Sequence, residues 1–475
     1  MQNLIVQILG SWTQAGSMLS YSPYSLFSDL FILLIECSML RHLSEEAILF
    51  VHLLKWLILA TTVGGLVGLS STGFMLLLSL VIDCVASITW GWWFLPIGLA
   101  LSAWVTTRLV PEAGGQGVER VIRSIHLQSG KIAWQVIPAK IGATILTIGT
   151  GGSAGNIGPC VQIGSGLSAA VADLFQFEAP ERKTLVMCGL SAGFSAIFGA
   201  PLAGAIFGIE ALFIGSLTYH VLFPSAVASI VAYLVATWLG IPPLNFHAHL
   251  FPFFDFSFLL LALVAGVVFG ILAVIFIECL NGATRLTNAL HLSPVIQGFL
   301  AGWILLGLGT LISPLILGLG KETIQRALEG QVSLWALFLG KIITTTLTLR
   351  FGGSGGIILP ICFIGATSGG IFGAMLFQDP SLFAALGIAG LLAGAINTPL
   401  TAMLLGMELF GVTSGPYLLL TCTVAFLLSG HRSAIPTQLL QLQKAPALRG
   451  TLQKEIGQET FNLKDQPNTR KDEEL

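Results

Sequence analysis

The sequence GGSAGNIGP at residues 151–159 recurs with small changes as GGSGGIILP at residues 352–360. In both copies a run of glycine and other small residues is followed by a proline, Pro159 or Pro360. Glycine permits tight turns, and proline is favoured in the first turn of a helix, where its missing N–H has no intrahelical partner to lose. The two stretches therefore predict a pair of glycine-rich turns, each of which begins a helix.

Other blocks show that the similarity extends along most of the chain. The matched blocks are residues 115–123 with 318–326, residues 140–147 with 341–348, and the Pro-Leu segment before Glu210 with the Pro-Leu segment before Glu408. The blocks keep their order and nearly keep their spacing, which is the signature of an internal repeat. The chain is therefore interpreted as a duplicated unit.

The composition places both repeats in a lipid bilayer. Hydrophobic residues make up 54% of the chain and charged residues 9%, against about a quarter charged in soluble domains. Apolar stretches approach or reach the roughly 20 residues that span a bilayer. We therefore expect an all-α, multi-pass membrane protein. The net charge of −2 excludes a strongly basic surface, so no nucleic-acid partner is expected.

The seven cysteines lie in apolar sequence without the spacing of metal ligands, and are interpreted as packing residues. No metal site and no cofactor are predicted. The expected organisation is an N-terminal extension over residues 1–50, which could include an interfacial helix, a first membrane repeat over 51–240, a second over 250–440, and a short polar cytoplasmic tail over 441–475.

Duplicated membrane units often insert in opposite orientations, so that their interrupted, glycine-rich segments meet near the middle of the membrane. The amides at a helix start favour an anion by roughly 0.3–2 kcal/mol. Moving a bare anion into a low-dielectric interior costs several kcal/mol. One helix start is insufficient, but several that converge could hold an anion without trapping it. The pattern favours passage of a small inorganic anion.

Three segments resemble the pore motifs of the CLC family of chloride channels and chloride/proton antiporters. They are PEAGGQGV at residues 111–118, GNIGP at 155–159 and GGIILP at 355–360. The resemblance extends from about Leu53 to Leu442 and implies a CLC-type fold of tilted and broken helices in two inverted repeats. It also implies a homodimer with one anion pathway per subunit, and chloride as the permeant ligand. We expect a prokaryotic-type member without a C-terminal regulatory domain.

The resemblance assigns the anion pathway to particular residues. The backbone amides carried over from the family are those of Asn156, Ile157, Gly158, Ile357, Ile358 and Leu359. The residues that shape the two helix starts are Gly155, Pro159, Gly355, Gly356 and Pro360. Gln116 matches the family's central serine, and Arg432 matches its central tyrosine. Two interpretations of Arg432 stay open: attraction of anions at the inner mouth, or an anchor at the membrane interface.

Two positions depart from the family pattern. Ile157 stands where most members have a gating glutamate, and Ala211 where proton-coupled members have a second, inner glutamate. Coupling requires a residue that changes state with the proton, so the sequence favours passive anion conduction. Glu210 and Glu408 are matched in the repeats and are interpreted as structural carboxylates. An antiporter with a displaced proton path and a pore that has lost conduction remain alternatives.

An enzyme is the remote alternative. The segment around Ser354 fits the G-x-S-x-G pattern of serine hydrolases, which would make it an intramembrane nucleophile. The matching Ser153 argues against this, because a catalytic serine is needed once whereas a pore lined by two halves needs the turn twice. We therefore predict no enzymatic activity and no catalytic residues.

Overall fold

A computed structural model describes residues 23–240, 244, 246, 248–332, 334–444 and 455–456, with side chains from Glu45 onward. By its internal contacts the chain divides into a unit of residues 1–57 and a unit of residues 58–475. The second unit contains the site described below. The first part of the predicted N-terminal extension and most of the predicted tail lie outside the described residues.

The described part of the chain forms sixteen α-helices, which divide into two series of eight. The first series is α2 (Pro23–Ser87), α3 (Leu95–Trp104), α4 (Val118–Leu127), α5 (Val136–Gly149), α6 (Ile157–Leu174), α7 (Ala179–Phe198), α8 (Pro201–Glu210) and α9 (Leu222–Trp238). The second is α10 (Phe256–Ala289), α11 (Pro294–Leu311), α12 (Lys321–Leu328), α13 (Trp335–Arg350), α14 (Ile358–Met375), α15 (Pro380–Ile396), α16 (Pro399–Phe410) and α17 (Gly415–Leu428). The matched sequence blocks fall on corresponding helices, so the duplication of the sequence is also a duplication of the fold.

Corresponding helices end and begin by the same local chemistry. The residues that directly follow α7 and α15, Gly199 and Asn397, both adopt the left-handed region, with φ of 68° and 56°. Glycine and asparagine are the residues that most readily adopt this conformation. Each is followed two residues later by a proline, Pro201 or Pro399, which begins the next helix. The chain therefore breaks at the same place in both repeats.

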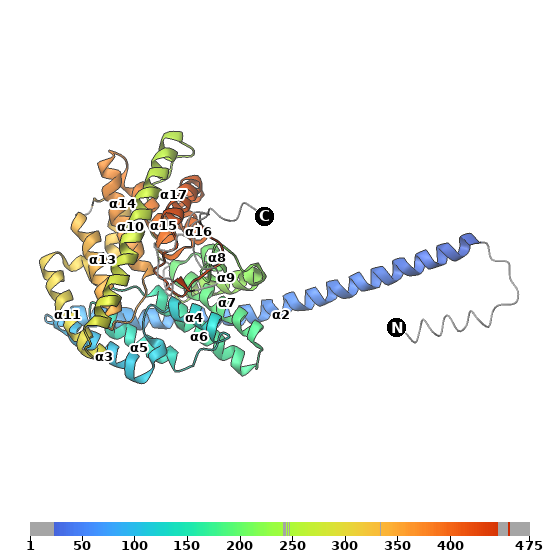
Figure 1. The fold of residues 1–475 in the computed structure, drawn as a ribbon, viewed down its shortest axis with the longest axis horizontal. Coiled ribbons are helices and arrows are strands. Elements are labelled where there is room, and N and C mark those ends of the chain that lie inside the picture. The colour runs from blue at the N-terminus through green and yellow to red at the C-terminus, as the bar shows by residue number, and fades with distance from the viewer. Residues whose placement is uncertain are drawn as a thin grey trace, which may run out of the picture. The chain divides into compact units, whose positions relative to one another are not determined.

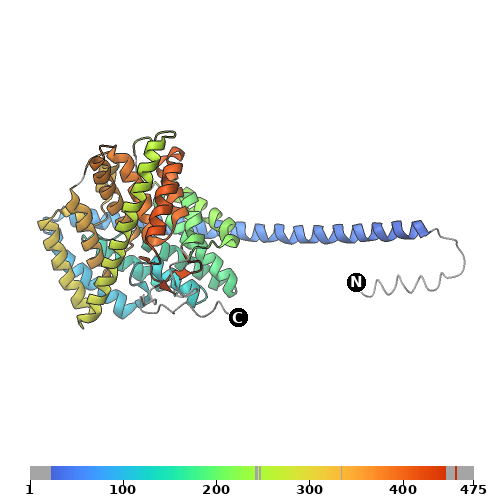
Figure 2. The same cartoon turned by 45° about the horizontal axis from the view of Figure 1, so that its top comes forward.

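The most deeply buried helices lie at the centre of the second unit. The helix α15 is buried from Ser381 to Ile396, and α7 from Thr184 to Phe198. A helix that is apolar on every side must be surrounded by other helices. Figures 1 and 2 show α15 among α10, α14, α16 and α17, and α7 packs against α6, α8 and α9. The core therefore places α6 and α14, the neighbours of these helices, in the interior.

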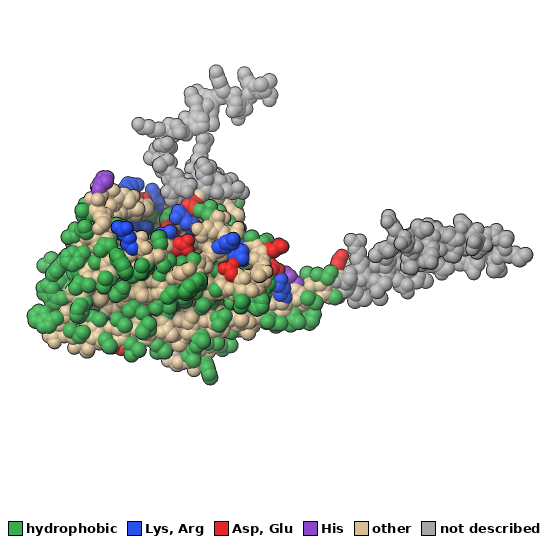
Figure 3. Space-filling view, turned by 90° about the horizontal axis from the view of Figure 1, so that it is seen from below, with side chains coloured by type: hydrophobic (Ala, Val, Ile, Leu, Met, Phe, Trp, Pro, Cys, Tyr) green, Lys and Arg blue, Asp and Glu red, His purple; other side chains and the backbone are tan. Residues whose placement is uncertain are grey.

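The outer surface of the bundle is apolar, as a bilayer requires. Five helices of the described residues are long and apolar enough to cross a membrane, and several shorter apolar helices accompany them. Figure 3 shows hydrophobic side chains over the flank and charged side chains gathered along one edge. Tryptophan is enriched at membrane interfaces, and eight tryptophans are exposed here. These are Trp90, Trp92, Trp93, Trp104, Trp134, Trp238, Trp303 and Trp335.

The chain after α17 folds back as an extended segment instead of forming another helix. Its strand β2 (Leu439–Leu440) pairs in parallel with β1 (Phe213–Ile214), which follows α8. The segment ends at Lys444, whose Nζ donates to Phe426 O at 2.7 Å and to Ser429 Oγ at 2.9 Å. This small sheet was not predicted from the sequence, and it ties the end of the second repeat to the first.

Candidate anion pathway

The two glycine-rich turns meet in the interior of the protein. Gly155 and Gly356 form an antiparallel bridge in which Gly155 N donates to Gly356 O at 2.8 Å and Gly356 N donates to Gly155 O at 2.6 Å. The helices α6 and α14 begin at Ile157 and Ile358, two residues after the bridge. The two predicted helix starts therefore lie beside each other, joined by a reciprocal pair of backbone hydrogen bonds.

Neither helix start is capped by a side chain. The first amides of an α-helix have no intrahelical acceptor and carry partial positive charge. In α6 the residue before the helix, Asn156, directs its Nδ2 to Met75 Sδ at 2.9 Å instead of accepting from the helix. In α14 the corresponding residue is Ile357, which has no polar side chain. The amides at both starts are thus left available for a ligand.

The loop before α4 packs directly against the start of α6. A Cβ on Gly158 would lie 2.3 Å from Gln116 O, and a Cβ on Gly117 would lie 2.3 Å from Gly158 O. Only glycine tolerates so close an approach of two backbones. The structure therefore brings the backbone of Gln116 against the start of α6, although the two segments are distant in the sequence.

Gln116 is buried and its amide lies between two groups. Oriented to satisfy both, the amide nitrogen donates to Ala434 O at 3.0 Å and the amide oxygen accepts from Arg350 Nη2 at 3.3 Å. Ala434 belongs to the segment after α17, and Arg350 is the last residue of α13. Three separated parts of the chain therefore meet at Gln116.

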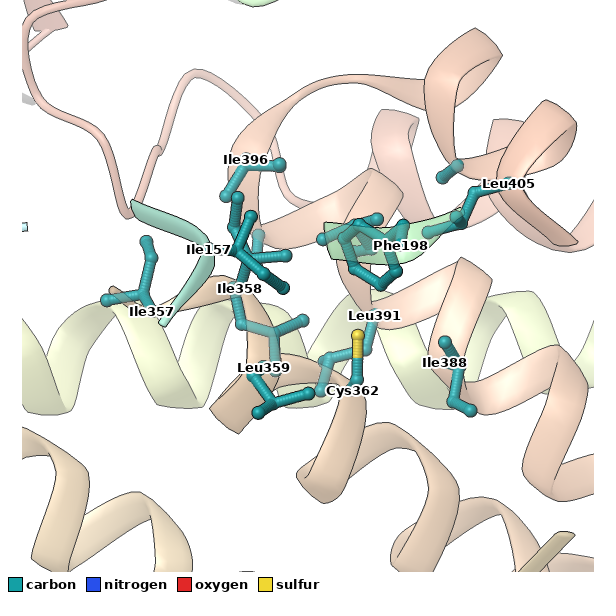
Figure 4. Packing of buried hydrophobic residues seen from close by; sticks show 14 of the residues in the cluster. Ile157, Phe198, Ile357, Ile358, Leu359, Cys362, Ile388, Leu391, Ile396 and Leu405 are labelled. Atoms are coloured by element: carbon teal, nitrogen blue, oxygen red, sulfur yellow. The ribbon is translucent and has the colours of Figure 1, made fainter. Parts of the chain in front are cut away.

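Apolar side chains surround the two helix starts. Ile157, Ile358 and Leu359 have no exposed surface. Figure 4 shows them in one hydrophobic cluster with Phe198, which ends α7, and Ile396, which ends α15. The position matched to the family's gating glutamate thus holds a buried hydrocarbon side chain, which cannot bind or release a proton.

Two buried lysines fix the loops that precede α4 and α12. Lys140 Nζ donates to Gly115 O at 2.7 Å and to Ala113 O at 3.2 Å. In the second repeat Lys341 Nζ donates to Gly318 O at 2.8 Å and to Ile316 O at 3.3 Å. Both lysines lie in matched blocks of the sequence, but their role could not be predicted without the contacts. They position the Gln116 loop and its counterpart.

Hydroxyl groups connect the repeats behind the turns. Ser354 N donates to Thr147 Oγ1 at 2.9 Å, and Ser153 N donates to Thr348 Oγ1 at 3.1 Å. The Oγ of Ser354 lies 3.3 Å from Thr144 Oγ1. Within the described residues no histidine contacts either serine hydroxyl. Both serines therefore take part in matched hydrogen bonds between the repeats.

Glu210 and Glu408 each cap the helix that contains the other glutamate. The carboxylate of Glu210 accepts from Leu400 N at 2.9 Å and from Thr401 N at 2.7 Å, at the start of α16. The carboxylate of Glu408 accepts from the backbone N of the second and third residues of α8, at 2.8 Å each. A carboxylate at a helix N-terminus is stabilising. Ala211, which follows Glu210, is buried and its carbonyl accepts from Gln438 Nε2 at 2.9 Å.

Arg432 occupies a different place from Gln116. Its Nε donates to Glu278 Oε1 of α10 at 3.0 Å, and its side chain is 46% exposed. No described contact joins Arg432 to Gln116. The backbone after α17 explains the difference, since it is Ala434, two residues later, whose carbonyl accepts from the Gln116 amide. Among the described residues, the arginine that contacts Gln116 is Arg350.

Two inverted repeats, whose uncapped helix starts meet inside an apolar bundle, define a membrane protein that transports ions. The family description "Voltage gated chloride channel" matches residues 97–430. The chain therefore belongs to the CLC family of anion transport proteins.

Individual relatives agree with this assignment. The chain is 32% identical over 400 residues to a protein of Pseudomonas syringae pv. tomato named chloride/fluoride channel protein, covering 82% of this chain and 87% of the relative. A crystal structure of a CLC-type fluoride/proton antiporter is similar with a TM-score of 0.77 and 27% identity, covering 82% of this chain and 98% of the other. A slow cyanobacterial Cl⁻/H⁺ antiporter has the same fold, with a TM-score of 0.69 and 23% identity over 79% of this chain and 94% of the other.

Proposed function

We propose that this protein conducts chloride or a similar small anion passively, without coupling to protons. The observation that carries the proposal is the buried isoleucine at the start of α6. Ile157 lies where the family's glutamate would compete with the anion, and it has no exposed surface and no titratable group. Without a side chain that changes charge, the anion has no partner through which a proton could be exchanged.

The proposed pathway passes the amides of the two helix starts and the Gln116 loop. Its binding groups are the amides of Asn156, Ile157, Gly158, Ile357, Ile358 and Leu359. These N–H dipoles stabilise a negative charge without binding it as tightly as a paired lysine would. Fluoride is a second candidate anion, because one relative is named a chloride/fluoride channel protein and a similar structure is a fluoride/proton antiporter.

The absence of an inner glutamate supports the same proposal. Ala211 lies where that residue is expected, and its neighbour Glu210 is held by two backbone amides and by Thr401 Oγ1 at 2.6 Å. A carboxylate with three donors is suited to a structural role. An antiporter with a displaced proton path is the second candidate. It is favoured only by the antiporters among the structural relatives.

We further propose that the protein is a homodimer in the inner membrane, with one pathway in each subunit and no enzymatic activity. Membership of the family supports the dimer. The matched hydrogen bonds of Ser153 and Ser354 support a structural role for these serines rather than catalysis.

The decisive experiment measures anion and proton movement together in liposomes. Purified protein should release chloride and fluoride down their gradients, while a pH indicator inside the vesicles reports no proton movement against the proton gradient. Empty liposomes and a proton ionophore provide the controls. Reproducible uphill proton movement driven by either anion would favour the antiporter instead.

A further inference from the structure

The inference concerns Arg350, a cation that the family resemblance does not assign to the pathway. Arg350 is the last residue of α13, a mostly apolar helix in which Lys341 is the one other charged residue. Lys140 matches Lys341 in the repeat, and by the same offset Arg350 corresponds to Gly149 in α5. The first repeat therefore has no equivalent cation. An ionisable residue in a membrane helix is expensive to bury and usually serves a function.

The guanidinium of Arg350 faces the Gln116 side chain and has no carboxylate partner among the described residues. Its Nη2 donates to the Gln116 amide oxygen at 3.3 Å. Its Nε is buried and has no hydrogen-bond partner there. The acidic group that acts on it electrostatically is Glu119 of α4, which forms no ion pair with it. Among the described residues, the Arg350 guanidinium thus has no ion-pair partner, and its Nε has no acceptor.

The position of Arg350 connects this charge to the helix starts. Gln116, its partner, packs through its backbone carbonyl against Gly158. Gly158 in turn lies against Gly356, so that a Cβ on Gly356 would be 2.6 Å from Gly158 N. The unpaired guanidinium is therefore separated from the uncapped start of α6 by one residue, Gln116.

We propose that Arg350 is the fixed positive charge of the pathway and that the small anion bound beside Gln116 is its counter-ion. Arg350 is half-buried, and its Nε is enclosed. A charge withdrawn from water is costly unless an opposite charge is close to it, and a permeant anion supplies that charge. Arginine also presents several N–H donors in a fixed arrangement, of which Nε is free to donate. The inference rests on the proposed function, because it names a residue that determines the anion affinity of the same site.

The test combines anion binding with transport. Chloride binding to detergent-purified protein is measured by titration calorimetry, and chloride flux is measured in liposomes. Arg350→Gln should weaken chloride binding by roughly tenfold, the loss expected for one hydrogen bond to a charged group. It should also lower the flux, most strongly at low ionic strength. The matched control is Arg182→Gln, which removes an arginine that is paired with Asp173 at 2.8 Å and should leave chloride affinity unchanged.

A second variant keeps the test informative if Arg350→Gln does not fold. Arg350→Lys keeps the charge but loses the guanidinium fork, so it should change the ranking among chloride, bromide, nitrate and fluoride. An Arg350→Gln protein that folds and binds chloride as tightly as the wild type would overturn the inference. So would an Arg350→Lys protein with wild-type affinity and ranking. A wild type that binds chloride but does not conduct it would count against the proposed function alone.

Discussion

The two repeats differ little in the contacts that build the protein and most in the contacts beside the proposed pathway. The lysine, serine, threonine and glutamate contacts occur once in each half, with nearly equal distances. Gln116 and Arg350 do not follow this rule, because their counterparts are Leu319 and Gly149. These two unmatched residues contact each other.

The difference indicates which residues serve which purpose. A contact that is present in both repeats stabilises the architecture that the repeats share. A polar pair that is present in one half alone is not required by that shared architecture. A buried polar group must find a partner or destabilise the fold. The Gln116 and Arg350 pair is therefore a chemical difference between the two halves beside the proposed pathway.

The largest expected effect comes from breaking a matched contact. Glu210→Ala should destabilise the protein by about 2–4 kcal/mol, because it leaves buried amides at the start of α16 without an acceptor. Glu408→Ala should cost about 1–2 kcal/mol, because that carboxylate is less buried and has fewer donors. Thermal unfolding of the two purified variants gives the comparison. Equal losses would show that the two caps contribute alike in spite of their different burial.

An intermediate effect is expected from placing a charge at the start of α6. Ile157→Glu should lower anion flux by roughly tenfold, or about 1.4 kcal/mol, near neutral pH. The flux should recover on acidification, since a carboxylate competes with the anion and a carboxylic acid does not.

Ile157→Gln is the matched control, because its side chain has the same shape without the titration. Its flux should vary little with pH. An Ile157→Glu flux that is the same at about pH 5 and about pH 8 would place this side chain away from the anion.

A smaller effect is expected from making the two loops alike. Gln116→Leu gives the first repeat the residue that Leu319 provides in the second, and removes a hydrogen bond worth about 0.5–1.5 kcal/mol. It should change the permeability ratios among chloride, bromide, nitrate and fluoride more than the stability. Gln297→Leu, which replaces a buried glutamine of α11, is the control and should leave these ratios unaltered.

The smallest effect concerns the segment that joins the end of the second repeat to the first. Burial lowers the pKa of Lys444 from its ordinary value of 10.5 to about 7. The folded segment therefore binds fewer protons than the unfolded chain between these two values, so its stability rises with pH across that window and is lowest below about pH 7.

Hydrogen exchange of the Leu439, Gln441 and Leu442 amides, corrected for the intrinsic effect of pH, measures this docking. Protection should rise a few-fold from neutral to mildly alkaline pH. In Lys444→Met the protection should not depend on pH. The same pH dependence in both proteins would assign the effect to another group.

Much of the architecture could be predicted because the internal repeat can be detected in the sequence. The glycine-rich turns and their prolines predicted two helix starts, and α6 and α14 begin where these residues are. The family and the two-repeat membrane fold were confirmed. A repeated pattern is visible without knowing which residues touch, so these features required no tertiary information.

The contacts of unmatched residues could not be predicted in this way. Arg350 lies outside the shared pattern, and its contact with Gln116 joins α13 to a loop more than 200 residues earlier in the chain. One signal was present, since Arg350 is a charge in an apolar helix whose repeat counterpart is glycine. The position of Arg432 depended on the register of the segment after α17, where the extended backbone offers no periodicity to align.

The reciprocal bridge between Gly155 and Gly356 also bears on the origin of the fold. Each glycine donates one backbone hydrogen bond to the other and accepts one from it. In the same way, Glu210 and Glu408 each accept hydrogen bonds from the start of the helix that contains the other. Such reciprocity defines an isologous interface, in which one surface is complementary to itself. A half-length chain with these residues would present the same contacts to a copy of itself. Two such copies joined end to end would keep these contacts, while positions outside them, such as Gln116 and Arg350, can differ between the halves.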